Sequence, residues 1–263
     1  MLLQVQPKYY LTACLMFKDA APYLDEWLRF HCRVGFDHFY LYDNDSSDDY
    51  TAVLRPLQDR GHITLHGWPG ASQQERAFQH AIDNYRHEAR WMAFLDDDEF
   101  LFSPQNANLP EVLPIYELYA GVAAAWLVFG SSGRKSRRPG WVTLNYRRRA
   151  ALPDKHVKCI VNPAKVIGPA VIGHHFHCVP GETIVDEKFE PLSGPFAAHP
   201  SADVLCINHY ISKSLEELRW RRSRPTAYGE PMYTCEEYVT ADAGFNEIED
   251  TRIQPLIEAL KGI

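Results

Sequence analysis

Apolar and polar residues alternate along the first hundred positions in a way that predicts strands and helices in turn. Mostly apolar runs predict strands at residues 9–17, 38–42, 62–66 and 91–95. Apolar residues at helical spacing predict intervening helices, one from a cap at Asp19 to Gly35, one over 50–57 behind Asp48 as its cap, and one around 78–85. This order predicts an α/β fold, with a mostly parallel sheet flanked by helices on both faces.

The second half of the chain has a less regular pattern. A helix is predicted over 110–119, followed by an apolar strand at 123–129 and a loop of Ser, Gly and Arg over 130–140. Further strands are expected at 157–161, 171–176 and 204–207. Ser214 and Glu217 form a capping box that begins a helix to about Arg222, and a last helix is expected over 253–261. We expect a single domain over residues 1–263.

Composition narrows the class of protein. Hydrophobic residues make up 46% of the 263 residues and charged residues 23%, which is enough to bury a core and excludes a disordered chain. No apolar run approaches the roughly 20 residues of a membrane span, and no signal peptide is visible at the start. Six scattered cysteines without a C-x-x-C pair predict reduced thiols and a cytoplasmic protein, with contact at the inner face of the membrane left open.

Charge is unevenly distributed along the chain. The formal net charge of −7 argues against nonspecific binding of nucleic acid. Residues 131–158 nevertheless hold nine Lys and Arg residues and one acid, Asp154, a local charge of +8. A solvated basic face is one interpretation of this segment, and a surface for an anionic ligand is the other.

The sharpest chemical feature is the run Asp96-Asp97-Asp98 directly after an apolar strand. If this run is extended, its alternate residues point the same way, so that Asp96 and Asp98 can face one ion. Mg²⁺ and Mn²⁺ prefer oxygen ligands, and Mg²⁺ commonly uses one or two carboxylates together with substrate phosphates. An exposed acidic turn is the alternative.

A second acidic loop, residues 43–48, also follows a predicted strand. The carboxyl ends of parallel strands meet at one edge of the sheet, where ligands bind, so we expect both loops there. Asp43 could accept hydrogen bonds from a ribose or base, or it could serve only as an Asx-turn residue.

Three segments of the first half resemble the GT-A glycosyltransferases, and more narrowly their family 2-like and family 92 group. They are Glu26-Trp27-Leu28 with His31 and Gly35, residues 40–48 (YLYDNDSSD), and Trp91 with residues 95–101 (LDDDEFL). Later segments match too, namely 158–163 (KCIVNP), His174-His175 and 208–214 (NHYISKS). One departure is Lys18-Asp19-Ala20, where such proteins commonly read Lys-Asn-Glu. The resemblance covers residues 9 to about 222.

The resemblance implies a nucleotide-sugar donor, most often UDP-linked, and Mn²⁺ or Mg²⁺ on its diphosphate. Asp96 and Asp98 match the D-x-D motif for metal and donor, and Asp43 matches the acidic residue that faces the nucleoside. His209 is a candidate third metal ligand, with a structural histidine as the alternative and with His174, His175 and His177 as competitors. Lys213, together with the arginines of the following helix, is a candidate for the phosphates. We expect a nucleotide-sugar half to about residue 105 and an acceptor-side half from about 106.

The acceptor side is less defined by the sequence. Ser131 and Ser132 lie in a loop of small residues that could admit an acceptor sugar or could be a plain surface loop. The resemblance favours inversion, which needs a base for the acceptor hydroxyl. Asp186 is ranked first, with Glu187 and Asp154 as further candidates. The basic segment suggests a glycan acceptor that is anionic or lipid-linked.

The sequence therefore predicts a metal-dependent, inverting glycosyltransferase. Two other classes stay open. A metal-dependent phosphohydrolase or nucleotidyltransferase also uses acidic strand ends, although the residues after Asp98 lack the Thr or Val of a phosphatase motif and no Gly-rich phosphate loop with a Lys is present. The other is a non-catalytic relative that binds sugar nucleotides.

Overall fold

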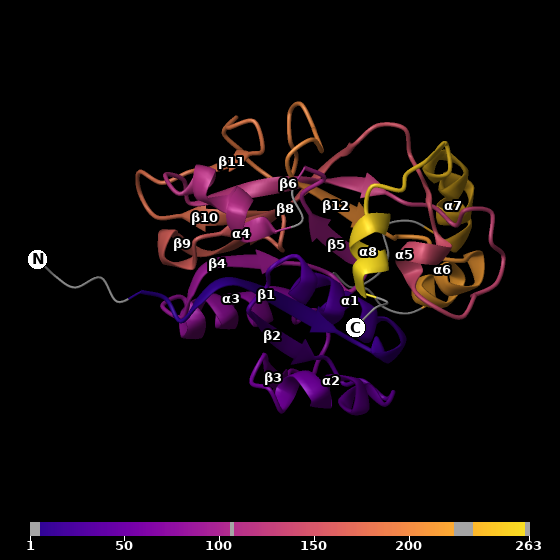
Figure 1. The fold of residues 1–263 in the computed structure, drawn as a ribbon, viewed down its shortest axis with the longest axis horizontal. Coiled ribbons are helices and arrows are strands. Elements are labelled where there is room, and N and C mark those ends of the chain that lie inside the picture. Colours follow the sequence, from indigo (N-terminus) through magenta and orange to yellow (C-terminus); the bar gives the residue numbers. More distant parts are fainter. Residues whose placement is uncertain (1–5, 106–107, 224–233, 261–263) are drawn as a thin grey trace, which may run out of the picture.

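The computed structural model describes residues 6–105, 108–223 and 234–260. Its first part alternates strands and helices as the sequence predicts (Figure 1). The elements are β1 (Tyr9–Phe17), α1 (Ala21–Arg33), β2 (His38–Asp43), α2 (Tyr50–Gln58), β3 (Ile63–Gly67), α3 (Gln74–Tyr85) and β4 (Ala89–Phe94). Each predicted strand and helix of this part is present, with ends that differ by a few residues.

The second part holds shorter elements, several of which the sequence did not indicate. They are β5 (Glu99–Phe102), α4 (Leu109–Val112), η1 (Leu113–Tyr116), β6 (Gly121–Val128), α5 (Val142–Asn145), β7 (Arg148–Arg149), β8 (Asp154–Val161), η2 (Pro163–Lys165), β9 (Val166–Val171) and β10 (His175–Cys178). The chain continues through β11 (Ile184–Asp186), β12 (Cys206–His209), α6 (Leu215–Arg222), α7 (Cys235–Ala241), η3 (Asp242–Phe245), β13 (Ile248–Glu249) and α8 (Gln254–Leu260). The last residue of the predicted helix over 253–261 lies outside the described residues.

One sheet unites both parts of the chain. Its strand order is β3-β2-β1-β4-β8-β6-β12-β5, with β11 also paired to β6. Strands β1 to β4 are mutually parallel, as are β6, β11 and β12, whereas β8 and β5 run antiparallel to their neighbours. The predicted α/β fold with a mostly parallel sheet is therefore confirmed. The division near residue 105 stays a prediction.

Apolar side chains bury both faces of this sheet. One core gathers Leu24, Trp27 and Leu28 of α1 with Leu256 and Ile257 of α8. The other gathers side chains of α3, β9 and β10 on the opposite face. Helices α5 to α8 gather near one end of the sheet, seen at the right of Figure 1. None of the described helices is long and apolar enough to cross a membrane.

The predicted caps of the first two helices are wrong. Asp19 lies in the left-handed region with φ of +51°, and Ala20 occupies the N-cap of α1 without a side-chain bond. The Asp48 carboxylate instead accepts the backbone N–H of Ala21, the first residue of α1, at 2.8 Å. Helix α2 begins after Asp49, so Asp48 is not its cap. A tertiary contact has taken the place of the local cap.

Two further predictions need correction. The single strand predicted over 171–176 is a hairpin, because β9 ends at Val171 and β10 begins at His175 after a turn at Gly173, where φ is +67°. The helix predicted over 110–119 is one short α-turn followed by the 3₁₀-helix η1. The capping box at Ser214 is confirmed, with both reciprocal hydrogen bonds present.

Candidate functional site

The carboxyl ends of the parallel strands place the acidic residues at one edge of the sheet. Asp43 ends β2, and Asp96 follows two residues after β4. His209 ends β12, which pairs in antiparallel register with β5, so that His209 lies opposite Glu99. The edge therefore brings together side chains that are more than one hundred residues apart in the sequence.

Residues 96–99 form a tight turn between β4 and β5. The backbone N–H of Glu99 donates to the carbonyl of Asp96 at 3.1 Å. The indole N–H of Trp27 in α1 donates to the carbonyls of Asp96 at 3.1 Å and Glu99 at 2.9 Å, which fixes both ends of the turn. The expectation of an extended Asp96–Asp98 run is therefore wrong, since the turn and not strand alternation sets where the carboxylates point.

Two buried side chains hold the Asp96 carboxylate. The Lys158 ammonium lies 2.9 Å from Oδ2, and the Gln74 side-chain amide donates to Oδ1 at 2.8 Å. Lys158 is only 2% exposed. Burial alone would raise the pKa of Asp96, but the ammonium outweighs it and holds that pKa below its usual range.

A different pair of groups faces the Asp98 carboxylate, which is fully buried. The His209 Nε2 lies 3.6 Å from Asp98 Oδ2, and Arg221 of α6 forms an ion pair with the same oxygen. Burial would raise the pKa of Asp98, but Arg221 and then His209 bring it well below the usual range. Asp98 Oδ1 and His209 Nδ1 are buried without a hydrogen-bond partner in the described structure.

These two orphaned atoms bear on whether a divalent metal fits. Buried polar atoms are normally satisfied, so the Asp98 oxygen left without a partner suits a group that is added later. His209 faces the same carboxylate through Nε2, not through the orphaned Nδ1. Within residues 6–105, 108–223 and 234–260, no three His, Cys, Asp or Glu side chains form a ready metal cluster. Two protein ligands supplemented by phosphate oxygens are compatible with Mg²⁺, which retains few protein ligands. Asp98 and His209 fit such a group.

Glu99 adds a third buried carboxyl to the turn. Its Oε2 accepts the backbone N–H of Asp96 at 2.9 Å and lies 3.6 Å from the Lys158 ammonium. Burial raises the pKa of Glu99 to about 8, although Lys158 opposes this shift. Lys158 therefore serves two carboxyl groups, which one cation cannot fully compensate.

Lys213 lies at the start of α6. Its ammonium stacks on the ring of Tyr23 at 4.1 Å from the centroid, and its backbone is left-handed with φ of +49°. The helix that follows is fixed by Glu217, which accepts hydrogen bonds from Tyr23 at 2.6 Å and Tyr146 at 2.8 Å as well as from Ser214. The buried capping box thus positions both Lys213 and Arg221 relative to the acidic turn.

The loop after β2 is satisfied locally. Asp43 accepts the backbone N–H of Ser46 and the hydroxyl of Tyr50, each at 3.0 Å. Asn44 donates its amide to the carbonyls of Trp68 and Gly70 at 2.8 Å. The structure therefore shows Asp43 as a turn residue that accepts local hydrogen bonds, as one of the two interpretations expected. The role of Asp43 toward a nucleoside stays a prediction.

The candidate acceptor residues are engaged in contacts within the protein. Ser131 donates its hydroxyl to Asp242 at 2.6 Å, and Ser132 accepts the backbone N–H of Arg147 at 2.9 Å. Arg148 donates to the carbonyls of residues 246 and 247, and Arg149 pairs with Asp250 at 2.6 Å. Much of the basic segment thus ties β7 to the C-terminal elements.

Asp186 does not join this edge. It pairs in register with Ala123, whereas His209 pairs with Val128 at the far end of the same strand, β6. Its Oδ1 accepts the backbone N–H groups of Lys188 at 2.8 Å and Glu190 at 3.0 Å, which closes a turn. Its role as base stays a prediction that this geometry does not favour.

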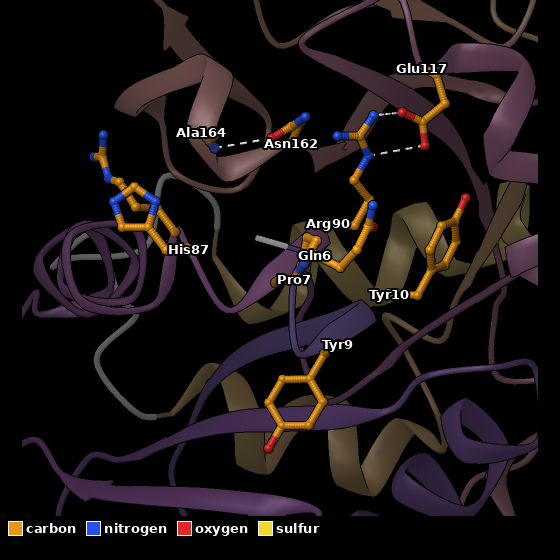
Figure 2. Close-up of a pocket in the computed structure, with 11 residues that line it drawn as sticks. Gln6, Pro7, Tyr9, Tyr10, His87, Arg90, Glu117, Asn162 and Ala164 are labelled. Atoms are coloured by element: carbon orange, nitrogen blue, oxygen red, sulfur yellow. Dashed lines mark hydrogen bonds and ion pairs between the residues drawn. The ribbon is translucent and has the colours of Figure 1, made fainter. Parts of the chain in front are cut away.

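A cavity of about 490 Å³ lies at the opposite end of the strands, where β1 and β4 begin (Figure 2). Tyr9, Tyr10 and Arg90 line it, and Arg90 donates from Nε to Glu117 at 3.1 Å. Arg90 and Glu117, which both line the cavity, are therefore paired with each other. The cavity is thus separated from the acidic turn by the length of the sheet.

Sequence reasoning gave no role to several residues that build the site. Trp27, Gln74 and Lys158 hold the turn in place, and Glu99 adds a further buried carboxyl group beside Lys158. A signal was available for Lys158, because a single lysine in an otherwise apolar strand needs a buried partner. No comparable signal marks Gln74, whose polar neighbours in the sequence conceal it.

Comparisons with known proteins show the family to which the chain belongs. The family model described as glycosyltransferase family 92 matches residues 9–190. A family 92 protein of Oryza sativa subsp. japonica is 35% identical over 67% of this chain and 31% of its own length. Galactan beta-1,4-galactosyltransferase GALS2 of Arabidopsis thaliana is 28% identical over 56% of this chain and 32% of its own.

Among solved structures, S. aureus TarS (residues 1–349) in complex with UDP matches with a TM-score of 0.39 and 13% identity. The match covers 59% of this chain and 47% of that one. The chain spans about a third of the length of the curated relatives it matches. The family model covers most of the chain and includes β1, the acidic turn and Lys158. The chain belongs to glycosyltransferase family 92.

Proposed function

We propose that this protein transfers a sugar from a UDP-sugar to a glycan acceptor, with a divalent metal and with inversion at the anomeric carbon. The observation that carries the proposal is the orphaned buried oxygen Asp98 Oδ1 at the carboxyl edge of the sheet, on a carboxylate whose other oxygen lies 3.6 Å from His209 Nε2. Ligands of such sheets bind at that edge. Family membership supports transfer, and the name of the galactan beta-1,4-galactosyltransferase relatives supports a galactosyl donor.

Each charged group of the edge has a part in this proposal. Asp98 and His209 hold Mn²⁺ or Mg²⁺, and Asp96 faces the same donor from its fixed position between Lys158 and Gln74. When bound, the metal acts as a Lewis acid that stabilises the departing diphosphate. Lys213 and Arg221 lie near the turn as cations for the phosphate oxygens, and Asp43 serves the nucleoside.

The acceptor side is proposed from charge. The basic segment over 131–158 favours an acceptor that is anionic or lipid-linked. A surface with clustered positive charges attracts anions over about one Debye length. Ser131 and Ser132 hold the loop that begins this segment, so they shape the acceptor side through the backbone. A peripheral contact with a membrane would follow from a lipid-linked acceptor.

Calorimetry of UDP binding tests the proposal. UDP is expected to bind in the presence of Mn²⁺ and to bind at least tenfold more weakly when the metal is removed by chelation. Asp98→Ala is expected to abolish this dependence on metal, because it removes the carboxylate that the orphaned oxygen belongs to. Asp45→Asn is the matched control, since Asp45 is an exposed carboxylate in the loop after β2.

Product analysis separates the competing classes. A transferase releases UDP and forms a glycoside, whereas a phosphohydrolase releases inorganic phosphate without an acceptor. Equal UDP affinity with and without metal would contradict the proposed metal site. Intact donor binding with no turnover of any UDP-sugar would identify a non-catalytic relative.

A further inference from the structure

The amino end of β8 carries a carboxylate–imidazole pair, of which Asp154 is one of the candidate bases named from the sequence and His156 has no role so far. His156 Nδ1 lies 2.5 Å from Asp154 Oδ1, and the same oxygen accepts the backbone N–H of His156 at 2.8 Å. Both side chains are reachable from solvent, at 38% and 39% exposure. Because β8 is antiparallel to its neighbours, its amino end lies at the edge where β6 ends.

The ring of Trp126 joins this pair to the candidate metal site. The His156 ring stacks on Trp126 with centroids 5.0 Å apart and an interplanar angle of 20°. The His209 ring packs on the same indole at 4.2 Å, and Asp154 pairs with Trp126 in the β6–β8 register. One aromatic ring therefore separates the imidazole of His156 from that of His209.

Contacts of the rings show how the pair lies relative to the acidic turn. The β6–β8 register is irregular between Val157 and Asp154, so contacts and not alternation locate His156, whose ring stacks on Trp126. Lys158 reaches Asp96 at 2.9 Å, and His174 packs beside both Trp126 at 5.2 Å and His156 at 6.1 Å. Contacts through Trp126 therefore connect the pair to His209, which lies beside the turn.

The contacts of the pair orient the imidazole. Burial would raise the pKa of Asp154, but the hydrogen bonds from His156 hold it below its usual range, so the carboxylate is ionised. An ionised carboxylate at Nδ1 keeps the proton on that nitrogen and leaves Nε2 with a lone pair. In the described part of the chain, Nε2 of His156 has no hydrogen-bond partner.

We propose that His156 is the general base of the transfer reaction and that Asp154 is its positioning residue. This inference rests on the proposed function. The acceptor hydroxyl gives its proton to His156 Nε2 as its oxygen bonds to the anomeric carbon. The bond from that carbon to the diphosphate oxygen breaks, and its electron pair leaves with UDP. The imidazolium, stabilised by Asp154, then returns the proton to solvent.

The surroundings of the pair suit a sugar ring. Phe196 packs edge-on against His156 at 4.7 Å and is 46% exposed. The Lys155 ammonium lies over the Phe196 ring at 4.6 Å from its centroid, so an aromatic ring, a cation and a hydrogen-bond acceptor lie together here for a sugar and its hydroxyl. Asp186, by contrast, accepts two backbone hydrogen bonds of its own turn with one carboxylate oxygen, and it lies beside the other end of β6.

Kinetics of His156→Ala test the assignment. The probes are UDP-galactose with β-1,4-galacto-oligosaccharides, and then water alone as the acceptor. The turnover number is expected to fall about 10²-fold or more, and added imidazole is expected to restore part of it. Affinity for UDP with Mn²⁺, measured by calorimetry, is expected to stay within about twofold of wild type.

Two controls and one spectroscopic measurement complete the test. His199→Ala, an exposed histidine between β11 and β12, is expected to leave turnover unchanged. Asp186→Asn tests the competing base assignment in the same assay. Long-range ¹H–¹⁵N NMR is expected to show His156 protonated at Nδ1, and Asp154→Asn is expected to lose that preference while lowering turnover with little change in KM for the donor.

The outcomes separate the two proposals. Unchanged turnover in His156→Ala, or loss of turnover in Asp186→Asn with the fold intact, overturns the assignment and leaves the proposed function standing. Protonation of His156 at Nε2 in the wild type also overturns it. A wild-type protein that binds no UDP with Mn²⁺ overturns the proposed function, and the base assignment falls with it.

Discussion

Two acidic loops at the same edge of the sheet satisfy their carboxylates in different ways. In the loop after β2, Asp43 accepts hydrogen bonds from Ser46 and Tyr50, three and seven residues away. In the turn after β4, the partners of Asp96 and Asp98 are cations 62 and 123 residues away in the sequence. Composition and position in the fold are similar, yet the first loop closes on itself and the second depends on distant charges.

The difference teaches where a binding site is to be expected. Local hydrogen bonds to neutral groups leave little demand for a further cation at Asp43. At the turn, Asp98 Oδ1 and Glu99 Oε1 remain buried without partners even with Lys158 and Arg221 in place. An orphaned oxygen also occurs at Asp48 in the first loop, but it has no second orphaned ligand beside it in the described structure. Unsatisfied charge that persists in the folded state marks the turn as the site.

Removal of Lys158 is expected to have the largest effect on stability, because the turn after β4 depends on this distant cation and the loop after β2 does not. Lys158→Met leaves the buried Asp96 carboxylate without its cation, beside the carboxyl group of Glu99, and loss of one partner of a buried pair costs about 3 kcal/mol. That corresponds to a fall in Tm of about 6–12 °C in a chain of this size. Differential scanning calorimetry measures it at pH 7.

The matched control is Lys155→Met, an exposed lysine three residues earlier on β8. Its Tm is expected to stay within about 2 °C of the wild type, since surface changes cost little. The deficit of Lys158→Met is expected to shrink at lower pH, where the carboxyl groups take up protons. A deficit independent of pH would contradict the electrostatic explanation.

Glu99 gives a smaller effect that depends on pH. Its pKa is raised in the folded state from 4.5 to about 8, so the folded protein binds more protons than the unfolded chain between these values. Stability contributed by the neutral form is therefore lost as pH rises through this window. Glu99→Gln removes this titrating group. Between pH 5 and 9 the Tm of the variant is therefore expected to fall less than the Tm of the wild type. The difference between the two falls is about 2–4 °C for each 1 kcal/mol of pH-dependent stability that Glu99 contributes.

Glu258→Gln, on an exposed position of α8, supplies the control and is expected to follow the wild-type pH profile. Parallel Tm curves for the wild type and Glu99→Gln would show that Glu99 does not titrate in this window. The calorimetric scans are best taken without divalent metal, since metal at the turn changes the charge that Glu99 experiences.

Asp43→Asn is expected to have the smallest effect. The amide oxygen can still accept the backbone N–H of Ser46, and the amide NH2 can donate to the hydroxyl oxygen of Tyr50, which now donates to the other carboxylate oxygen. Stability is therefore expected to change by no more than about 0.5 kcal/mol. If Asp43 serves the nucleoside, loss of its charge weakens UDP binding about fivefold, because a hydrogen bond to a charged group is worth roughly 1 kcal/mol more than one to a neutral group. Calorimetry measures both. A loss of stability as large as that of Lys158→Met would show that the two loops are not different in kind.

Prediction from sequence worked best where each element carries its own signal. Strand β1 has the predicted limits, and the capping box at Ser214 forms as predicted, because apolar runs and caps act over a few residues. It failed at Asp19 and Asp48, where a loop 27 residues away supplies the cap, and at residues 171–176, where a turn splits the strand. Short elements such as β5 and β11 gave no signal, because sheet pairing stabilises them and not their own composition.

The candidate site divides along the same line. The sequence by itself determined that carboxylates follow apolar strands, and therefore that Asp43, Asp96 and Asp98 come to one edge of a parallel sheet. Only the tertiary structure decided which cation serves which carboxylate, that residues 96–99 turn instead of extending, and that Asp186 lies apart while the rings of His156 and His209 contact the same indole of Trp126. The physical reason is that charge compensation and ring packing act through space, between segments whose separation along the chain carries no information about their contact.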